Sequence, residues 1–137
     1  MFFKKTEKIT ENGGLIKIAA LLIHAAKIDE NYSHHEEKII KKTLLELGAS
    51  DKNINNIIKD GTKIEKDSNQ ILEFTKEVKN MDNLNKIKII ESLWRIIYSN
   101  KEADIYETSL MRRLTGLLYI DSKTMGDIKS KIKKEHY

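Results

Sequence analysis

Apolar residues recur along most of the chain at the three-to-four-residue spacing of one face of a helix. Seven such stripes follow one another: Leu15, Ile18, Ala19, Leu22 and Ala26; Ile39, Ile40, Thr43, Leu44 and Leu47; Ile54, Ile57 and Ile58; Ile71, Phe74, Thr75, Val78 and Met81; Ile87, Ile90, Trp94, Ile97 and Tyr98; Leu110, Met111, Leu114, Leu117 and Leu118; Met125, Ile128 and Ile132. The pattern predicts an all-α protein of about seven helices, with a short helix preceding Gly13-Gly14.

Residues typical of helix ends stand between the stripes. A side-chain oxygen before the first turn accepts a backbone N–H, and Glu or Gln three residues later can bond back to it. Such boxes are Ser33 with Glu36, Asp67 with Gln70, and Asp104 with Glu107; single caps are Ser50, Asp82 and Asp121. Gly48 and Gly61 are placed for helix C-termini, and Gly13-Gly14 for a turn.

The composition limits the chain to one domain over residues 1–137. It contains no cysteine and no proline, which excludes disulfides and thiolate metal sites. The net charge is +4, but 22 of the 25 basic residues are lysines. Nucleic-acid surfaces favour arginine for bidentate contacts, so this charge says little about function.

Nothing near the start resembles a signal peptide, since polar and charged residues follow Phe2-Phe3 directly. The longest uncharged run, residues 18–26, is far shorter than the roughly 20 residues of a membrane span. We therefore expect a cytoplasmic bacterial protein.

An internal repeat is visible at an offset of 71 residues, which places Leu22 on Leu93 and Ile57 on Ile128. Helix, polar connection, helix, cap and helix occur in the same order in both copies. We predict a first repeat over about residues 15–61, a connecting helix over about 67–81 and a second repeat over about 84–135. Two such units would pack as a bundle with a pseudo-twofold axis.

The polar connection of each repeat carries oxygen ligands at alternate positions. They are Asp29, Asn31 and Ser33 in the first copy, and Asn100, Glu102 and Asp104 in the second. This alternation is that of an EF-hand loop, but its glycine and its final glutamate are missing from both copies. Glu36 and Glu107 could complete a smaller oxygen site, or could simply cap their helices.

Signatures of catalysis are absent from the sequence: no His-Glu-x-x-His, no Gly-x-Ser-x-Gly and no phosphate-binding glycine loop occurs. We expect no enzymatic activity. His34-His35 fits an exposed helix start, and His24 a partly buried histidine with a hydrogen-bond partner. The C-terminal lysines (Lys129, Lys131, Lys133 and Lys134) leave weak nucleic-acid binding as the alternative function, although a solvated helix end explains them better.

Two segments of the chain resemble a known family. Residues 91–107 read ESLWRIIYSNKEADIYE and are followed by LMRRL at 110–114, while residues 20–29 read ALLIHAAKID. They are similar to the tellurite-resistance TerB-like family, with its "ALW-x-(V/I)-A-Y-A-D-G-E-(L/I)-D-x-x-E", its "L-(V/I)-R-R" and, in its other half, its "LL-x-x-(V/A)-A-x-A-D-G". Between them, residues 74–76 resemble the connecting helix of small alphaproteobacterial members. The resemblance covers about residues 15–130.

The resemblance implies a seven-helix pseudo-twofold bundle, related to the N-terminal domain of DjlA-type co-chaperones. It also implies protein partners in tellurite and stress responses, and a divalent cation such as Ca²⁺ at acidic loops. Carried onto this sequence, the cation ligands are Asp29, Glu36, Asp104 and Glu107. The Asp-Gly of the family is Asp29-Glu30 in one loop but Asn100-Lys101 in the other, which lowers the cation affinity expected of the second loop.

Overall fold

The computed structural model describes residues 2–27, 34–67, 71–99 and 105–136, with the side chains of residues 2–12, 105–108 and 136 outside the description. This part of the chain forms seven α-helices and no strand, which confirms the all-α prediction. The helices are α1 (Phe2–Lys27), α2 (His34–Glu46), α3 (Ile54–Asp67), α4 (Leu72–Lys79), α5 (Asn83–Tyr98), α6 (Ile105–Leu117) and α7 (Ser122–His136).

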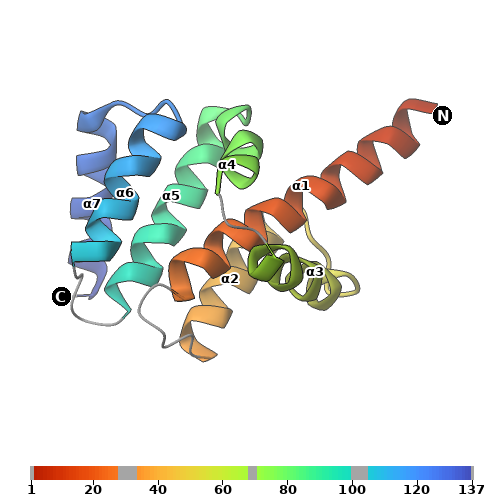
Figure 1. The fold of residues 1–137 in the computed structure, drawn as a ribbon, viewed down its shortest axis with the longest axis horizontal. Coiled ribbons are helices and arrows are strands. Elements are labelled where there is room, and N and C mark those ends of the chain that lie inside the picture. The colour runs from red at the N-terminus through yellow and green to blue at the C-terminus, as the bar shows by residue number, and fades with distance from the viewer. Residues whose placement is uncertain (1, 28–33, 68–70, 100–104, 137) are drawn as a thin grey trace.

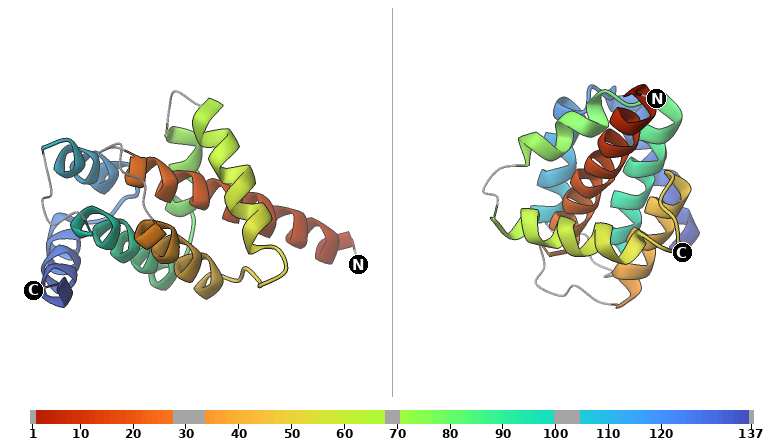
Figure 2. Two further views of the ribbon diagram at one scale, coloured as in Figure 1. Left: turned by 90° about the horizontal axis from the view of Figure 1, so that it is seen from below. Right: turned by 90° about the vertical axis from the view of Figure 1, so that its right-hand side faces the viewer.

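Helix α1 is the centre of the bundle. It packs against α2, α3, α4 and α5, and the end-on view of Figure 2 shows it surrounded by other helices. Every residue from Ile18 to Ile23 is buried, so this part of α1 is enclosed on all sides rather than along one stripe. Its N-terminal end projects away from the other helices (Figure 1).

Gly13 and Gly14 lie inside α1, so the predicted turn and the separate short helix before it are wrong. Each glycine costs a helix about 1 kcal/mol relative to alanine. Burial of the apolar segment that follows outweighs this cost. Gly14 also has a packing role, because a Cβ there would lie 3.0 Å from Oε2 of Glu77 on α4.

Gly61 was predicted to end a helix but lies within α3, where it is buried. A Cβ at this position would lie 2.8 Å from Cβ of Ala19 and 3.1 Å from the carbonyl oxygen of Ile16. The glycine therefore permits α3 to approach α1 closely. The helix continues to Asp67, so the predicted cap at Asp67 is also wrong; α4 starts at Leu72, preceded by Ile71.

Other predicted helix ends are confirmed. The carboxylate of Asp82 accepts the N–H of Asn85 at 2.9 Å, and that of Asp121 accepts the N–H of Thr124 at 2.6 Å. Ser50 exchanges side-chain to backbone hydrogen bonds with Asn53 before α3. Gly48 adopts φ of 119°, a conformation that glycine accommodates without strain, and thereby ends α2. Ser33 and Asp104 lie outside the described residues.

The first and third helices of each predicted repeat pack against each other, α1 on α3 and α5 on α7. The connecting helix α4 covers one side of α1 and also contacts α5 and α6. This arrangement agrees with two related units, but the repeat boundaries stay a prediction.

Candidate functional site

Of the four predicted cation ligands, only Glu36 has a described side chain. Asp29 and Asp104 lie outside the described residues, and Glu107 is described only as part of the backbone of α6. Among the described side chains, no group of three or more histidines and carboxylates is placed to hold a metal ion. The cation site therefore stays a prediction.

Glu36 is the third residue of α2 and is fully buried. A carboxylate removed from water is costly unless a hydrogen-bond donor or a positive charge compensates it. The first turn of a helix supplies one such contribution, since its free N–H groups and its dipole favour negative charge. His34 and His35, two positions before it, are exposed, as predicted for a helix start in solvent.

His24 of α1 and Glu65 of α3 form a polar cluster with Lys27. Nδ1 of His24 lies 3.2 Å from Oε2 of Glu65, and Nζ of Lys27 donates to Oε1 at 3.0 Å. Only 12% of the Glu65 side chain is exposed. The prediction that His24 is partly buried with a hydrogen-bond partner is confirmed, and the cluster joins α1 to α3.

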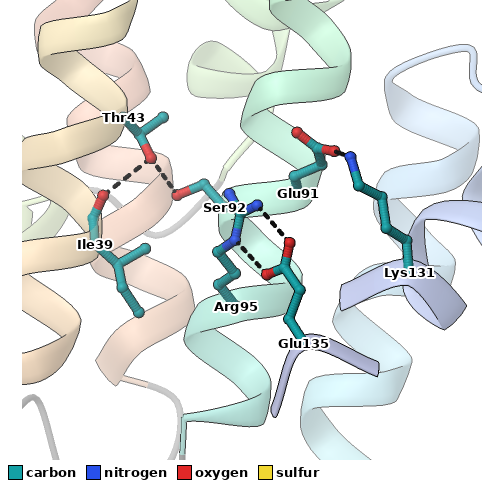
Figure 3. Close-up of polar contacts among 7 residues, drawn as sticks. All are labelled: Ile39, Thr43, Glu91, Ser92, Arg95, Lys131 and Glu135. Atoms are coloured by element: carbon teal, nitrogen blue, oxygen red, sulfur yellow. Dashed lines mark hydrogen bonds and ion pairs between the residues drawn. The ribbon is translucent and has the colours of Figure 1, made fainter. Parts of the chain in front are cut away.

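A second polar seam joins α5 to α7 (Figure 3). Arg95 makes a two-pronged ion pair with Glu135 at 3.0 and 3.1 Å, and Lys131 donates to Glu91 at 2.6 Å. The hydrogen bond from Glu135 is the main cause that raises the pKa of Arg95 above its ordinary value. Lys131 is therefore engaged within the fold, which weakens the nucleic-acid interpretation of the C-terminal lysines.

A groove of about 610 Å³ lies between α6 and α7, with α5 beneath it. Its lining combines one aromatic ring, two methionines, two glycines and three charged side chains. The lining residues are Trp94, Met111, Arg112, Thr115, Gly116, Ile120, Asp121, Ser122, Met125, Gly126 and Lys129. The volume falls within the range typical of ligand-binding pockets, about 300–1,000 Å³.

The floor of the groove is apolar and fixed. Trp94 is 3% exposed, stacks on Tyr98 with ring centroids 5.7 Å apart, and donates its indole N–H to the sulfur of Met125 at 3.3 Å. Lys129 places its ammonium group 5.4 Å from the centre of the Trp94 ring. A positive charge therefore stands directly over the apolar floor.

Charges at the rim of the groove differ in their partners. Within the part of the chain that the structure describes, neither Arg112 nor Lys129 has an acidic group at ion-pair distance. Asp121 is engaged as the cap of α7, and the N–H of Thr124 lowers the pKa of its carboxyl group. The groove thus offers two uncommitted cations and one committed anion.

The sequence analysis did not identify this groove. Its only signals were two glycines, Gly116 and Gly126, inside helices with no turn to explain them, and the single tryptophan of the chain. A Cβ at either glycine would meet no atom within 4 Å, so neither glycine is needed for helix packing. Glycine at such a position leaves open space at the surface.

A second, shallower hollow of about 530 Å³ lies on α2. It is lined by Lys38, Lys41, Lys42, Leu45 and Glu46. All five come from one helix, and Lys41 pairs with Glu37 at 3.4 Å. This hollow has no aromatic floor and serves below as the comparison surface.

Comparison with known protein families matches residues 15–130 to the family described as tellurite resistance protein TerB. No curated protein and no solved structure matches the chain. Within the described helices, none has the length and apolar character needed to cross a bilayer.

Proposed function

The chain belongs to the TerB family of tellurite resistance proteins, and on that premise we propose that it is a non-enzymatic interaction module of tellurite or stress response. The observation that carries this proposal is the family match over residues 15–130, which includes most of α1 and all of α2 to α6. The absence of catalytic signature motifs from the sequence also supports a binding role.

The proposal includes binding of a divalent cation such as Ca²⁺ at the acidic connections, through Asp29, Glu36, Asp104 and Glu107. Hard cations prefer carboxylate and carbonyl oxygens. The burial of Glu36 at the start of α2 supports the first connection, because a site that excludes water strengthens the attraction between a carboxylate and a cation. The second connection carries Asn100 and Lys101 and should bind more weakly.

Thermal unfolding with and without Ca²⁺, Mg²⁺, Mn²⁺ or Zn²⁺ tests the cation part. An ion that binds only the native state raises the melting temperature by mass action, by about 2.7 kcal/mol in stability at a hundredfold excess over Kd. The comparison is made within each variant, so that the intrinsic cost of changing buried Glu36 cancels.

We expect Asp29→Asn and Glu36→Gln to lose the shift that the wild-type chain shows, and Asp60→Asn, an exposed carboxylate on α3, to keep it. An equal shift in all four proteins, or no shift at millimolar metal, would remove the cation from the proposal.

Affinity capture from the native host tests the interaction part. The module should retain a defined partner reproducibly, with or without added metal chelator. A chelator that releases the partner would place the cation within the interaction.

A further inference from the structure

We propose that the groove between α6 and α7 binds an acidic, amphipathic segment of a partner protein. The segment would seat a bulky apolar side chain on the Trp94 floor and place carboxylates beside Arg112 and Lys129. This inference rests on the proposed function as an interaction module and names the partner's chemistry and its place on the fold.

The shape of the groove fits a peptide segment. Its two sides belong to different helices, and each side carries a glycine, Gly116 on α6 and Gly126 on α7. Since no atom occupies the space next to either glycine, the backbone of another chain can approach both helices closely. An amphipathic helix laid into a groove between two helices is a recurring mode of peptide recognition.

The floor favours a large apolar anchor. Met111 and Met125 flank the indole of Trp94, and Ile120 closes one end. Methionine side chains are flexible and polarizable, so they adapt to anchors of different shape. Aromatic floors beneath such anchors are typical of the residues that dominate binding energy at interfaces.

The charges select the sign of the partner. Arg112 and Lys129 lack acidic partners among the described residues, whereas the ion pairs of α5 with α7 already use Arg95 and Lys131. Asp121 adds one negative charge but is held as the cap of α7. The groove therefore carries a positive excess over its apolar floor, which favours carboxylates on the partner and repels lysines.

A direct test uses two designed helical peptides of roughly 16 residues, long enough for marginal helicity. Both carry leucine at helical spacing, and their remaining positions are mainly glutamate in one and lysine in the other. Trp94 is the only tryptophan of the chain, so its fluorescence reports on the groove itself. We expect a saturable change with the glutamate peptide and affinity at least about tenfold weaker for the lysine peptide.

Three variants of the full chain locate the site. Gly126→Leu fills the groove, and because leucine is the better helix former it should not lower the melting temperature. Arg112→Glu with Lys129→Glu reverses the charge of the rim. Lys41→Glu with Lys42→Glu makes the same change of charge on the hollow of α2.

We expect each of the first two variants to weaken the glutamate peptide by about tenfold or more, and the third to leave it within about twofold. If Gly126→Leu fails to fold, the two charge-reversed proteins decide the matter. The inference is overturned by the absence of saturable binding up to about 1 mM peptide, by equal binding to Gly126→Leu, or by equal losses on α2. Binding of decanoate in place of both peptides would instead assign the groove to a small amphipathic anion.

The same variants separate this inference from the proposed function. A host partner that Gly126→Leu still captures would leave the interaction module standing and place its contact surface elsewhere. Loss of capture in Gly126→Leu, with peptide binding also lost, is the outcome that both proposals require.

Discussion

The two halves of the molecule, α1 to α3 and α5 to α7, differ most where their first and third helices meet. In the first half the contact is made by small residues, since Gly61 of α3 leaves room for Ala19 of α1. At an offset of 71 residues the corresponding positions are Ile132 and Ile90, both fully buried. The same helix pair is thus packed by close approach in one half and by bulk in the other.

The polar contacts of these helix pairs correspond in position. Arg95 lies 71 residues after His24, and each pairs with a glutamate of the third helix, Glu135 and Glu65 respectively. A basic side chain on the first helix and an acid on the third therefore link both halves. This agreement favours the duplication that the sequence predicted.

The second and third helices of the two halves differ again. The groove positions Gly116, Gly126 and Lys129 correspond to Leu45, Asn55 and Ile58 in the first half. Side chains thus occupy the first half where glycines leave space in the second. The comparison indicates that packing of the first helix on the third maintains the fold, while the second and third helices can diverge for binding.

The largest effect should come from removing the bulk that holds α7 on α5. Ile132→Ala leaves a cavity in a fully buried position and should lower the free energy of unfolding by about 2–5 kcal/mol. Urea unfolding followed by circular dichroism measures the change. Leu84→Ala, on an exposed side chain, is the control and should cost no more than about 0.5 kcal/mol. A cost below 1 kcal/mol at Ile132 would show that bulk does not hold this pair together.

Glycine-to-alanine changes should have opposite signs in α3 and α7. Gly61→Ala places a Cβ 2.8 Å from that of Ala19, next to the backbone of α1, and should destabilise the protein by about 1–3 kcal/mol despite alanine's higher helix propensity. Gly126→Ala meets no atom and should stabilise it by up to about 1 kcal/mol. Thermal unfolding of the two variants side by side measures both changes, and the same sign in both would contradict the contrast.

A smaller effect is expected where the halves meet through α2 and α5. Thr43 and Ser92 hydrogen-bond each other at 2.7 Å in the core (Figure 3), whereas the positions 71 residues away, Leu114 and Leu21, are apolar. Thr43→Val leaves the buried Ser92 hydroxyl without this partner and should cost about 1–2 kcal/mol. Chemical denaturation of the single variant and of its double with Ser92→Ala measures the loss, and the double variant should regain part of it.

The smallest effect is expected at the ion pair of Arg95 with Glu135, which is about one-third exposed on the arginine side. A double-mutant cycle with Arg95→Met and Glu135→Gln should give a coupling energy of about 0.2–1 kcal/mol, decreasing with added salt. A larger, salt-independent coupling would mean that the pair is a main stabiliser of the α5–α7 contact.

Periodicity and caps predicted the helices well, because each depends on residues within one or two turns. The N–H groups accepted by Asp82 and Asp121 are three residues away in the chain. The errors at Gly13-Gly14 and Gly61 share one physical cause. A glycine in a helix is indistinguishable in sequence from a glycine that ends one, and only the approach of another helix decides between them.

The groove could not be predicted for a related reason. Arg112 and Lys129 are 17 residues apart in sequence, and only the separation of α6 from α7 creates the space that both line. Of the predicted cation site, the sequence located Glu36 at a helix start, but its complete burial follows from the packing of the bundle.

The most direct measurement is an amide chemical-shift map of the isotope-labelled chain with the glutamate peptide. We predict that the indole N–H of Trp94 and the amides of Gly116 and Gly126 shift together and saturate at one peptide per chain, while the face of α2 with Lys38, Lys41 and Leu45 stays unchanged. Shifts gathered on α2, or absent from α6 and α7, would contradict the claim that the second half opened its groove to bind a partner.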